Sequence, residues 1–281
     1  MPFPIYVPFF PGDEPSRLLS REAEPADEGS YAAEAEQMIS APVFAAALPA
    51  QGWLLDAGCG GGRWVRFAAV RGCRVVGVDW YVPALRRVRQ RAPAAALIAG
   101  DVGRLPLRDG SVASAISLGV VEHDPAGPDA MLAELARVIE PGGTLLLSVP
   151  YNNLLRRLVF NPRYRRFNNR WAGQGHYFVE YRFSASEMRR ALAQHGFTVE
   201  RFAVHEFPPP RNMGIVADRN MLSIRFVENG RGGWDLALPQ HRGWRVEGRW
   251  QPVLRALWKL SPWLVAGEIL AVARKRSEHR G

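Results

Sequence analysis

Two acidic residues and a glycine-rich turn stand at spacings that suit a nucleotide ligand. Asp56 ends a short apolar run, and the turn Gly58–Gly62 follows it almost at once. Twenty-three positions after Asp56, a second apolar run, Val75–Val78, ends in Asp79. Glycines allow a backbone to approach a ligand closely, and an acid at the tip of a second strand accepts two hydrogen bonds from a ribose diol. The pattern predicts the first strand–helix–strand unit of a sheet that binds a nucleoside.

The spacing of the glycines distinguishes between two kinds of nucleotide. The dinucleotide fingerprint G-x-G-x-x-G requires its third glycine at the position that Arg63 occupies here. Asp56 also lies two residues before the first glycine, Gly58, where a carboxylate would repel a pyrophosphate and attract an ammonium group. We therefore expect a nucleoside ligand that carries a positive charge.

The pattern D-x-G-C-G-G-G followed by V-x-G-V-D resembles the class I S-adenosylmethionine-dependent methyltransferases. Three later segments follow the same family pattern in order, so the resemblance covers about residues 50–150. They are 98–102, 112–123 and 131–149. The resemblance implies an α/β fold of three layers, with a doubly wound, mostly parallel seven-stranded sheet and an antiparallel last strand. Residues 265–274 are the expected last strand, inserted between the fifth and the sixth.

The resemblance also implies which residues bind S-adenosylmethionine, the cofactor of this family. The glycine turn would lie under its methionine part, with Asp56 near the ammonium group. The Asp79 carboxylate would bind the ribose hydroxyls, and Asp101 would meet the adenine amino group. Trp80 is expected to pack on the adenine ring, and Leu118 to lie near the sulfonium. The full set of expected cofactor residues is Asp56, Gly58, Gly60, Gly62, Asp79, Trp80, Asp101, Val102 and Leu118.

Methyl transfer from a sulfonium is an in-line displacement, so the protein must align the reacting atoms, exclude water and often remove a proton. His123 follows the fourth strand at the edge of the sheet where ligands of such folds bind, and a histidine there can act as a general base. A structural or cofactor-contacting histidine is the alternative. Other acceptor-site candidates lie in segments expected to cover the same edge: Tyr151, His176, Tyr177 and Tyr181.

The chain is interpreted as a single domain in four parts. Residues 1–30 are expected to be partly disordered or wrapped on the surface. The four parts are an N-terminal extension and covering helix (1–50), an S-adenosylmethionine-binding core (51–207) with a substrate-covering segment at about 151–182, an insertion (208–262), and the last strand with a basic tail (263–281).

Local signals predict individual helices in this plan. Ser184 and Glu187, three residues apart, predict a capping box at the start of a helix that ends before Gly196. A short basic helix, 152–160, is expected to lead into an arginine- and asparagine-rich loop. Further helices are expected at 31–48, interrupted at Pro42, and at 62–70, 83–91 and 128–139.

The formal net charge of +9 comes almost entirely from arginine. A high arginine content reflects either a GC-rich genome or an anionic partner. Six arginines lie within residues 156–170, which contain no acid, and Arg156 and Arg157 are flanked by apolar residues. This segment is a candidate for binding an anionic or lipid-linked acceptor, or the surface of an anionic membrane.

Two cysteines, Cys59 and Cys73, provide neither a disulfide framework nor a metal-ligand cluster, which suits a reducing cytosol. No segment has the features of a targeting signal, and no stretch reaches the roughly 20 apolar residues that span a bilayer. We therefore expect a cytoplasmic protein with no metal and no nucleic-acid partner. A peripheral position at the inner face of the membrane is compatible with these features.

The sequence as a whole predicts an S-adenosylmethionine-dependent methyltransferase for a small or medium-sized molecule, with oxygen as the favoured acceptor atom. One alternative is a nicotinamide-dependent oxidoreductase on a similar sheet. Arg63, at the position of the third glycine, and the acids Asp56 and Asp101 argue against it. The other is a non-catalytic relative that acts as a binding protein. The intact glycine turn argues against that reading.

Overall fold

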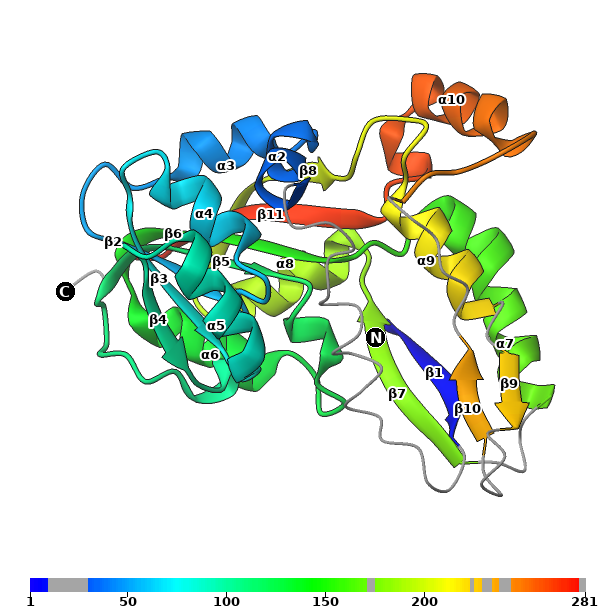
Figure 1. Ribbon diagram of the computed structural model, residues 1–281, viewed down its shortest axis with the longest axis horizontal. Coiled ribbons are helices and arrows are strands. Elements are labelled where there is room, and N and C mark those ends of the chain that lie inside the picture. The colour runs from blue at the N-terminus through cyan, green and yellow to red at the C-terminus, as the bar shows by residue number, and fades with distance from the viewer. Residues whose placement is uncertain (10–29, 171–174, 223–224, 229–233, 238–243, 278–281) are drawn as a thin grey trace.

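In the computed structural model, a core built on one large sheet has a smaller lobe beside it (Figure 1). The structure describes residues 1–9, 30–170, 175–222, 225–228, 234–237 and 244–277. The strands are β1 (Phe3–Phe9), β2 (Trp53–Ala57), β3 (Arg74–Asp79), β4 (Ala96–Ala99), β5 (Val112–Leu118), β6 (Ile139–Pro150), β7 (Gly175–Arg182), β8 (Phe197–His205), β9 (Arg225–Glu228), β10 (Trp234–Ala237) and β11 (Glu268–Lys275). The helices are α2 (Ser30–Gln37), α3 (Ala41–Ala47), α4 (Arg63–Ala69), α5 (Val82–Arg91), α6 (Asp129–Val138), α7 (Asn161–Arg170), α8 (Ala185–Gln194), α9 (Met213–Leu222) and α10 (Trp250–Leu260), with short turns η1 (Val102–Arg104), η2 (Val121–His123), η3 (Arg156–Phe160) and η4 (Pro262–Leu264).

The large sheet has seven strands in the order β4-β3-β2-β5-β6-β11-β8. The first five strands pair in parallel along this order. β11 lies between β6 and β8 and is antiparallel to both. The predicted fold class is confirmed, including the place of the antiparallel last strand, which covers Glu268–Lys275 rather than 265–274.

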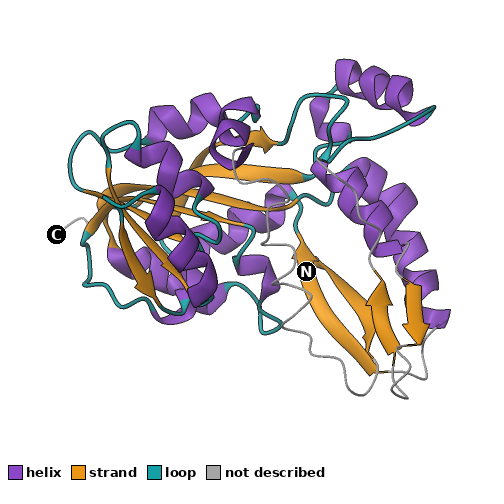
Figure 2. Cartoon of the chain, viewed as in Figure 1, coloured by secondary structure: helices purple, strands orange, loops and turns teal. Residues whose placement is uncertain are grey.

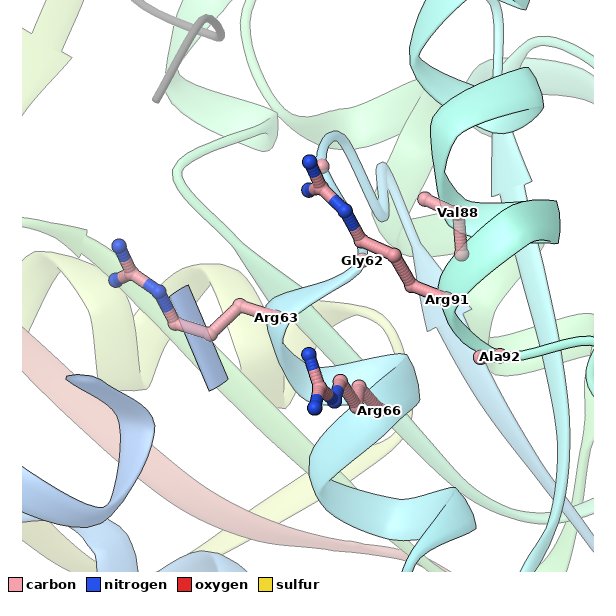
Figure 3. Close-up of a pocket in the computed structure, with 7 residues that line it drawn as sticks. Gly62, Arg63, Arg66, Val88, Arg91 and Ala92 are labelled. Atoms are coloured by element: carbon pink, nitrogen blue, oxygen red, sulfur yellow. The ribbon is translucent and has the colours of Figure 1, made fainter. Parts of the chain in front are cut away.

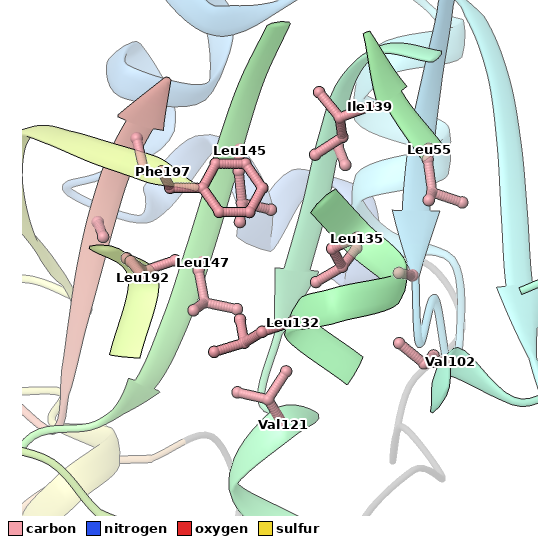
Figure 4. Close-up of a cluster of buried hydrophobic side chains, with 14 of the residues drawn as sticks. Leu55, Val102, Val121, Leu132, Leu135, Ile139, Leu145, Leu147, Leu192 and Phe197 are labelled. Carbon is pink, nitrogen blue, oxygen red and sulfur yellow. The ribbon is translucent and has the colours of Figure 1, made fainter. Parts of the chain in front are cut away.

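Apolar side chains cover both faces of this sheet, and helices pack on each face (Figure 2). One cluster joins α6 and α8 to the sheet through residues such as Leu135, Leu147 and Phe197 (Figure 4). The cluster on the other face includes Phe44 stacked on Trp64, with 3.7 Å between ring centroids. Strands covered on both faces are apolar without alternation. This explains the uninterrupted apolar runs in the sequence.

The predicted helix start at Ser184 is confirmed by its hydrogen bonds. The Ser184 hydroxyl accepts from the Glu187 N–H, and the Glu187 carboxylate accepts from the Ser184 N–H at 2.9 Å. The helix ends at Gln194, and Gly196 follows with φ of 83°, a conformation that favours glycine. Pro42 occupies the first turn of α3, where its missing N–H costs little.

The smaller lobe contains a strand that the sequence did not predict. β1 pairs antiparallel with β7 along its whole length. Helices α7 and α9 cover this pair through a cluster that includes Ile5, Phe160 and Tyr164. The expectation of disorder or surface wrapping for residues 1–30 is therefore wrong for 3–9, because Ile5 is buried only when β7 and α7 are in place. Residues 10–29 lie outside the described part of the chain.

The helix after Pro150 is longer than predicted. A π-helical turn, Arg156–Phe160, continues directly into α7, so the expected loop after residue 160 is wrong. The Asn161 N–H bonds to the Arg156 carbonyl, which is the wider pattern of a π turn. Pro162 follows this turn near the start of α7 and does not end the helix.

Three charged side chains are buried where this helix meets the core. Asp218 of α9 accepts hydrogen bonds from Arg156 Nε, at 2.8 Å, and from Arg182 of β7. All three residues are at most 3% exposed. Arg156 also donates to the Gly267 carbonyl at 2.7 Å, which joins the lobe to the residue before β11. The idea that Arg156 binds an acceptor or a membrane is therefore wrong, because its guanidinium is enclosed by these partners.

Replacing Asp218 with alanine should destabilise the protein by about 3–5 kcal/mol, because it leaves two buried guanidinium groups without their carboxylate. Chemical denaturation followed by circular dichroism measures this loss. The matched control is Asp109→Ala, which removes a carboxylate that pairs with Arg137 but is 81% exposed. That change should cost less than about 1 kcal/mol. Equal losses in the two variants would show that the buried network contributes no special stability.

Candidate cofactor and acceptor site

Four parallel strands bring the expected cofactor residues to one edge of the sheet. β2 pairs with β3 and β5, and β3 pairs with β4, so their carboxyl ends lie together. Asp56 lies near the end of β2 and Asp79 at the end of β3, while Leu118 ends β5. Asp101 and Val102 follow β4, where Val102 is buried at the start of η1. Ligands of open α/β sheets bind at this edge.

The glycine turn is tied to the end of β3 by backbone hydrogen bonds. The N–H groups of Gly58 and Cys59 donate to the Val78 carbonyl at 2.8 and 3.0 Å. The Gly60 N–H donates to Asp79 Oδ2 at 2.7 Å. Gly60 has φ of 47°, and a Cβ built on it would meet no heavy atom within 4 Å. The turn therefore presents an open backbone surface beside the Asp79 carboxylate.

Asp56 is buried under this turn, and its Oδ2 atom has no hydrogen-bond partner among the described residues. Burial, together with the nearby Asp79 charge, raises the pKa of Asp56 to about 7, against a hydrogen bond from the Val65 backbone. A buried carboxyl with an unused oxygen is a ready partner for a cation, since a positive charge offsets the cost of its ionisation.

The aromatic and acidic residues beyond the turn are open to a ligand to different degrees. Trp80 is 63% exposed, so one face of its indole is accessible. Asp101 is exposed and uses Oδ1 to accept from the Gly103 N–H at 2.8 Å. Asp79 Oδ1 accepts from the Tyr81 N–H at 2.8 Å, so this carboxylate also orders its own loop. The expected roles of these residues in binding adenine and ribose remain predictions.

The loop after β5 carries the expected base, His123, and a second titratable group beside it. His123 Nδ1 lies 2.7 Å from the Val179 carbonyl of β7. A carbonyl only accepts hydrogen bonds, so this ring nitrogen carries the proton and Nε2 is the proton-accepting nitrogen. His123 Nε2 lies 3.9 Å from Glu122 Oε1. Burial raises the pKa of Glu122 to about 8, which His123 opposes, so this carboxyl is largely protonated at neutral pH.

The acceptor-site tyrosines separate into two places. The Tyr181 hydroxyl of β7 donates to the Pro125 carbonyl at 3.0 Å, next to the loop of His123. Tyr177 is half-buried on the same strand. Tyr151 instead packs edge-on against Trp263 of η4, with 5.6 Å between ring centroids. The side chain of His176 lies outside the described side chains.

Residues 55–147 match the family model described as a methyltransferase domain. Over 150 residues the chain is 33% identical to a Mycolicibacterium smegmatis protein named "probable S-adenosylmethionine-dependent methyltransferase", with 52% of each chain covered. Over 95 residues it is 42% identical to the malonyl-[acyl-carrier protein] O-methyltransferase of Serratia marcescens, with 34% of this chain and 37% of the relative covered. The chain thus matches between a third and about half of the length of these relatives.

Residues 55–147 thus carry a methyltransferase domain, and the chain is similar to S-adenosylmethionine-dependent methyltransferases over about half of its length. A solved structure agrees at the level of the fold: the Burkholderia thailandensis 1,6-didemethyltoxoflavin-N1-methyltransferase, with its substrate and S-adenosylhomocysteine bound. It is 16% identical, has a TM-score of 0.52, and covers 98% of this chain and 96% of its own. The family match favours this assignment over the nicotinamide-dependent alternative. The cofactor of the family is S-adenosylmethionine.

The residues at this edge fit that cofactor. The unpartnered oxygen of buried Asp56 suits its ammonium group, and the open surface at Gly60 leaves room for its methionine part. The Arg63 side chain, which replaces the third glycine of a dinucleotide site, lines a pocket between α4 and α5 with Arg66 and Arg91 (Figure 3). Arg63 pairs with Glu34 of α2 at 3.2 Å, so it fastens the covering helix to the glycine turn.

One cluster of polar side chains, around His205, was not predicted from the sequence. The His205 ring lies between Ser40 Oγ, 2.7 Å from Nδ1, and Glu268 Oε2, 3.7 Å from Nε2. Ser148 donates to the same Glu268 oxygen at 2.7 Å. Burial lowers the pKa of His205 to about 3, with Arg63 contributing, so the ring stays neutral. Ser, His and Glu side chains also form catalytic triads. Ser40 is fully buried, however, so the contact of Ser40, His205 and Glu268 is structural.

No local sequence signal predicts this cluster, because Ser40, Ser148, His205 and Glu268 come from separate parts of the chain. Glu122 differs, since it stood beside His123 in the sequence and could have been weighed as a second titratable group. Among the described residues, no three His, Cys, Asp or Glu side chains gather as a metal site.

The affinity for S-adenosylhomocysteine, which retains the ammonium group, should rise about tenfold from pH 6 to pH 8. At pH 6 the Asp56 carboxyl, with a pKa of about 7, is mostly protonated and must release its proton to pair with the ammonium. At pH 8 it is already ionised. Titration calorimetry in buffers of different ionisation enthalpy measures both the affinity and the released proton.

Two variants separate this effect from other titrations. Asp56→Asn should bind more weakly and lose the pH dependence. Glu122→Gln, the matched control at the other buried carboxyl, should keep it. A wild-type affinity that does not change with pH would exclude Asp56 as the partner of the ammonium.

Proposed function

We propose that this protein transfers the methyl group of S-adenosylmethionine to an oxygen of a small or medium-sized acceptor. The acceptor would be bound where the carboxyl edge of the sheet faces β7. When bound, the cofactor supplies an electrophilic methyl group on a sulfonium. The protein supplies alignment, exclusion of water and removal of a proton, which together account for catalysis of an in-line transfer without a covalent intermediate.

The observation that carries the proposal is the hydrogen bond from His123 Nδ1 to the Val179 carbonyl. It leaves Nε2 as an acceptor at the sheet edge, next to the end of β5. A hydroxyl must lose its proton as its oxygen forms the new bond to carbon, and a neutral imidazole nitrogen can take that proton. The neighbouring Glu122, largely neutral at pH 7, adds no negative charge that would hold a proton on His123.

The lobe gives this edge a cover. β7 contacts the loop at two points, the His123–Val179 and Tyr181–Pro125 hydrogen bonds, and Asp218 fixes β7 through Arg182. A cover that is held on both sides restricts water and orients an acceptor. The similarity to an O-methyltransferase that acts on malonyl-[acyl-carrier protein] supports oxygen as the acceptor atom.

Labelled methyl transfer from S-adenosylmethionine to fractions of a cell extract tests the proposal. Label in an ether or ester product supports it. Label on nitrogen would overturn the choice of acceptor atom. Tight cofactor binding without transfer to any fraction would favour the non-catalytic alternative.

Changing His123 to glutamine should lower turnover by roughly 10² to 10⁴ and leave the affinity for S-adenosylhomocysteine nearly unchanged. The reason is that only proton removal is lost, since His123 is not among the residues expected to bind the cofactor. His195→Gln is the matched control, because His195 caps α8 and bonds to the Ala191 carbonyl away from the mouth. A matching loss of cofactor affinity in the His123 variant would mark the residue as structural.

A further inference from the structure

Helix α10 presents an apolar stripe to the solvent. Trp250, Val253 and Leu260 are 54%, 44% and 75% exposed. Their spacing places them on one face of the helix, with the partly buried Leu257 between them. We call these three residues the α10 stripe. In Figure 1 the helix lies at the outer end of the molecule, beyond α9.

The neighbouring face of α10 fixes its orientation. Leu254 is buried, and Leu257 and Trp258 pack with it against η4 and α9 in a small cluster that includes Val216 and Val265. The α10 stripe is therefore not the face by which the helix packs on the rest of the protein. It is a second apolar surface on a helix whose inner face is already covered.

A basic side chain borders the stripe, and acids are missing from it. Arg249 is exposed, and its guanidinium carbon lies 5.7 Å from the centre of the Trp250 ring. Arg255 and Lys259 are exposed on the other side of the helix. Residues 248–267 contain no aspartate or glutamate, and Glu247 is the acid that precedes them. Four of the nine tryptophans of the chain fall within residues 244–263. A helix with tryptophan and leucine on one side and cations beside it is suited to the boundary between headgroups and acyl chains.

A second exposed apolar pair lies near this helix. Leu154 and Leu158 are 50% and 68% exposed at the start of the long helix that continues into α7. Leu155, between them, packs against the same small cluster as Leu257 and Trp258. Arg157 is exposed in the same turn. The two exposed apolar surfaces therefore border one common cluster, each with a cation beside it.

We propose that the protein docks on an anionic lipid bilayer through the α10 stripe, with Arg249 pairing with a lipid phosphate. Among the described residues, no helix is long and apolar enough to cross a bilayer, and the docking needs none, because α10 lies parallel to the surface. An anionic surface complements the exposed Arg249 and Arg157 beside the two apolar surfaces. A second copy of the chain on the stripe would bring two Arg249 side chains into a region without acids, so self-association through this stripe is disfavoured by charge.

Co-sedimentation with vesicles tests the proposal, using the full chain at low ionic strength. Vesicles of equal parts phosphatidylglycerol and phosphatidylcholine should bind the wild type, and pure phosphatidylcholine vesicles should bind it much more weakly. Trp250→Ser/Val253→Ser/Leu260→Ser should weaken binding to the anionic vesicles by more than about tenfold. Arg249→Gln should weaken it by about fivefold, since each cation near an anionic surface contributes to binding.

The controls remove similar groups elsewhere. Val70→Ser deletes a 70% exposed apolar side chain just after α4, and Arg108→Gln/Arg201→Gln deletes two exposed cations outside α10. Both should bind vesicles like the wild type, and circular dichroism verifies that every variant is folded. Equal losses in the control and α10 variants would overturn the proposal, as would a wild type that fails to bind anionic vesicles. Light scattering that shows a dimer, dissociated by the triple serine change, would assign the stripe to a second copy instead. None of these measurements depends on methyl transfer.

Discussion

The buried carboxylate of Asp218 determines how the two parts of the molecule fit together. It neutralises Arg156 from the helix after β6 and Arg182 from β7, and Arg156 in turn bonds to the Gly267 carbonyl before β11. Two guanidinium groups in a dry interior are tolerated only with such a partner. The arrangement therefore holds α9 and β7 in one orientation relative to the large sheet.

This constraint reaches the site through β7. Because Arg182 ends that strand, the strand passes over the loop of His123 and forms the hydrogen bonds at Val179 and Tyr181. The proton-accepting nitrogen of His123 is thus selected by a strand of the lobe and not by its own loop. The same strand, β7, therefore covers this edge of the sheet and fixes which ring nitrogen of His123 carries the proton.

Two buried carboxyl groups lie at the carboxyl edge of the sheet. Burial raises the pKa of Asp56 to about 7 and that of Glu122 to about 8. Such groups favour a cationic ligand, because an incoming positive charge restores the ionised form of a buried carboxyl. This suits the ammonium and sulfonium of the cofactor.

The sequence by itself determined the cofactor half of the molecule. The glycine turn after Asp56, the acids Asp79 and Asp101 and the capping box at Ser184 are local features, set by backbone sterics, by strand ends and by pairs three residues apart. Such features do not depend on distant parts of the chain. Through the family resemblance that these features carry, the sequence predicted the sheet and the place of its antiparallel last strand.

Only the tertiary structure decided the rest. The pairing of β1 with β7 joins residues more than 160 positions apart, and Asp218 meets Arg156 across 62 positions. Whether an arginine is exposed or buried depends on such partners, so the sequence alone placed Arg156 on the surface, whereas its guanidinium is buried against Asp218. Composition shows that a segment is apolar and basic. Which of its faces remains open follows from the packing of distant segments, and the periodicity of a single helix does not contain that information.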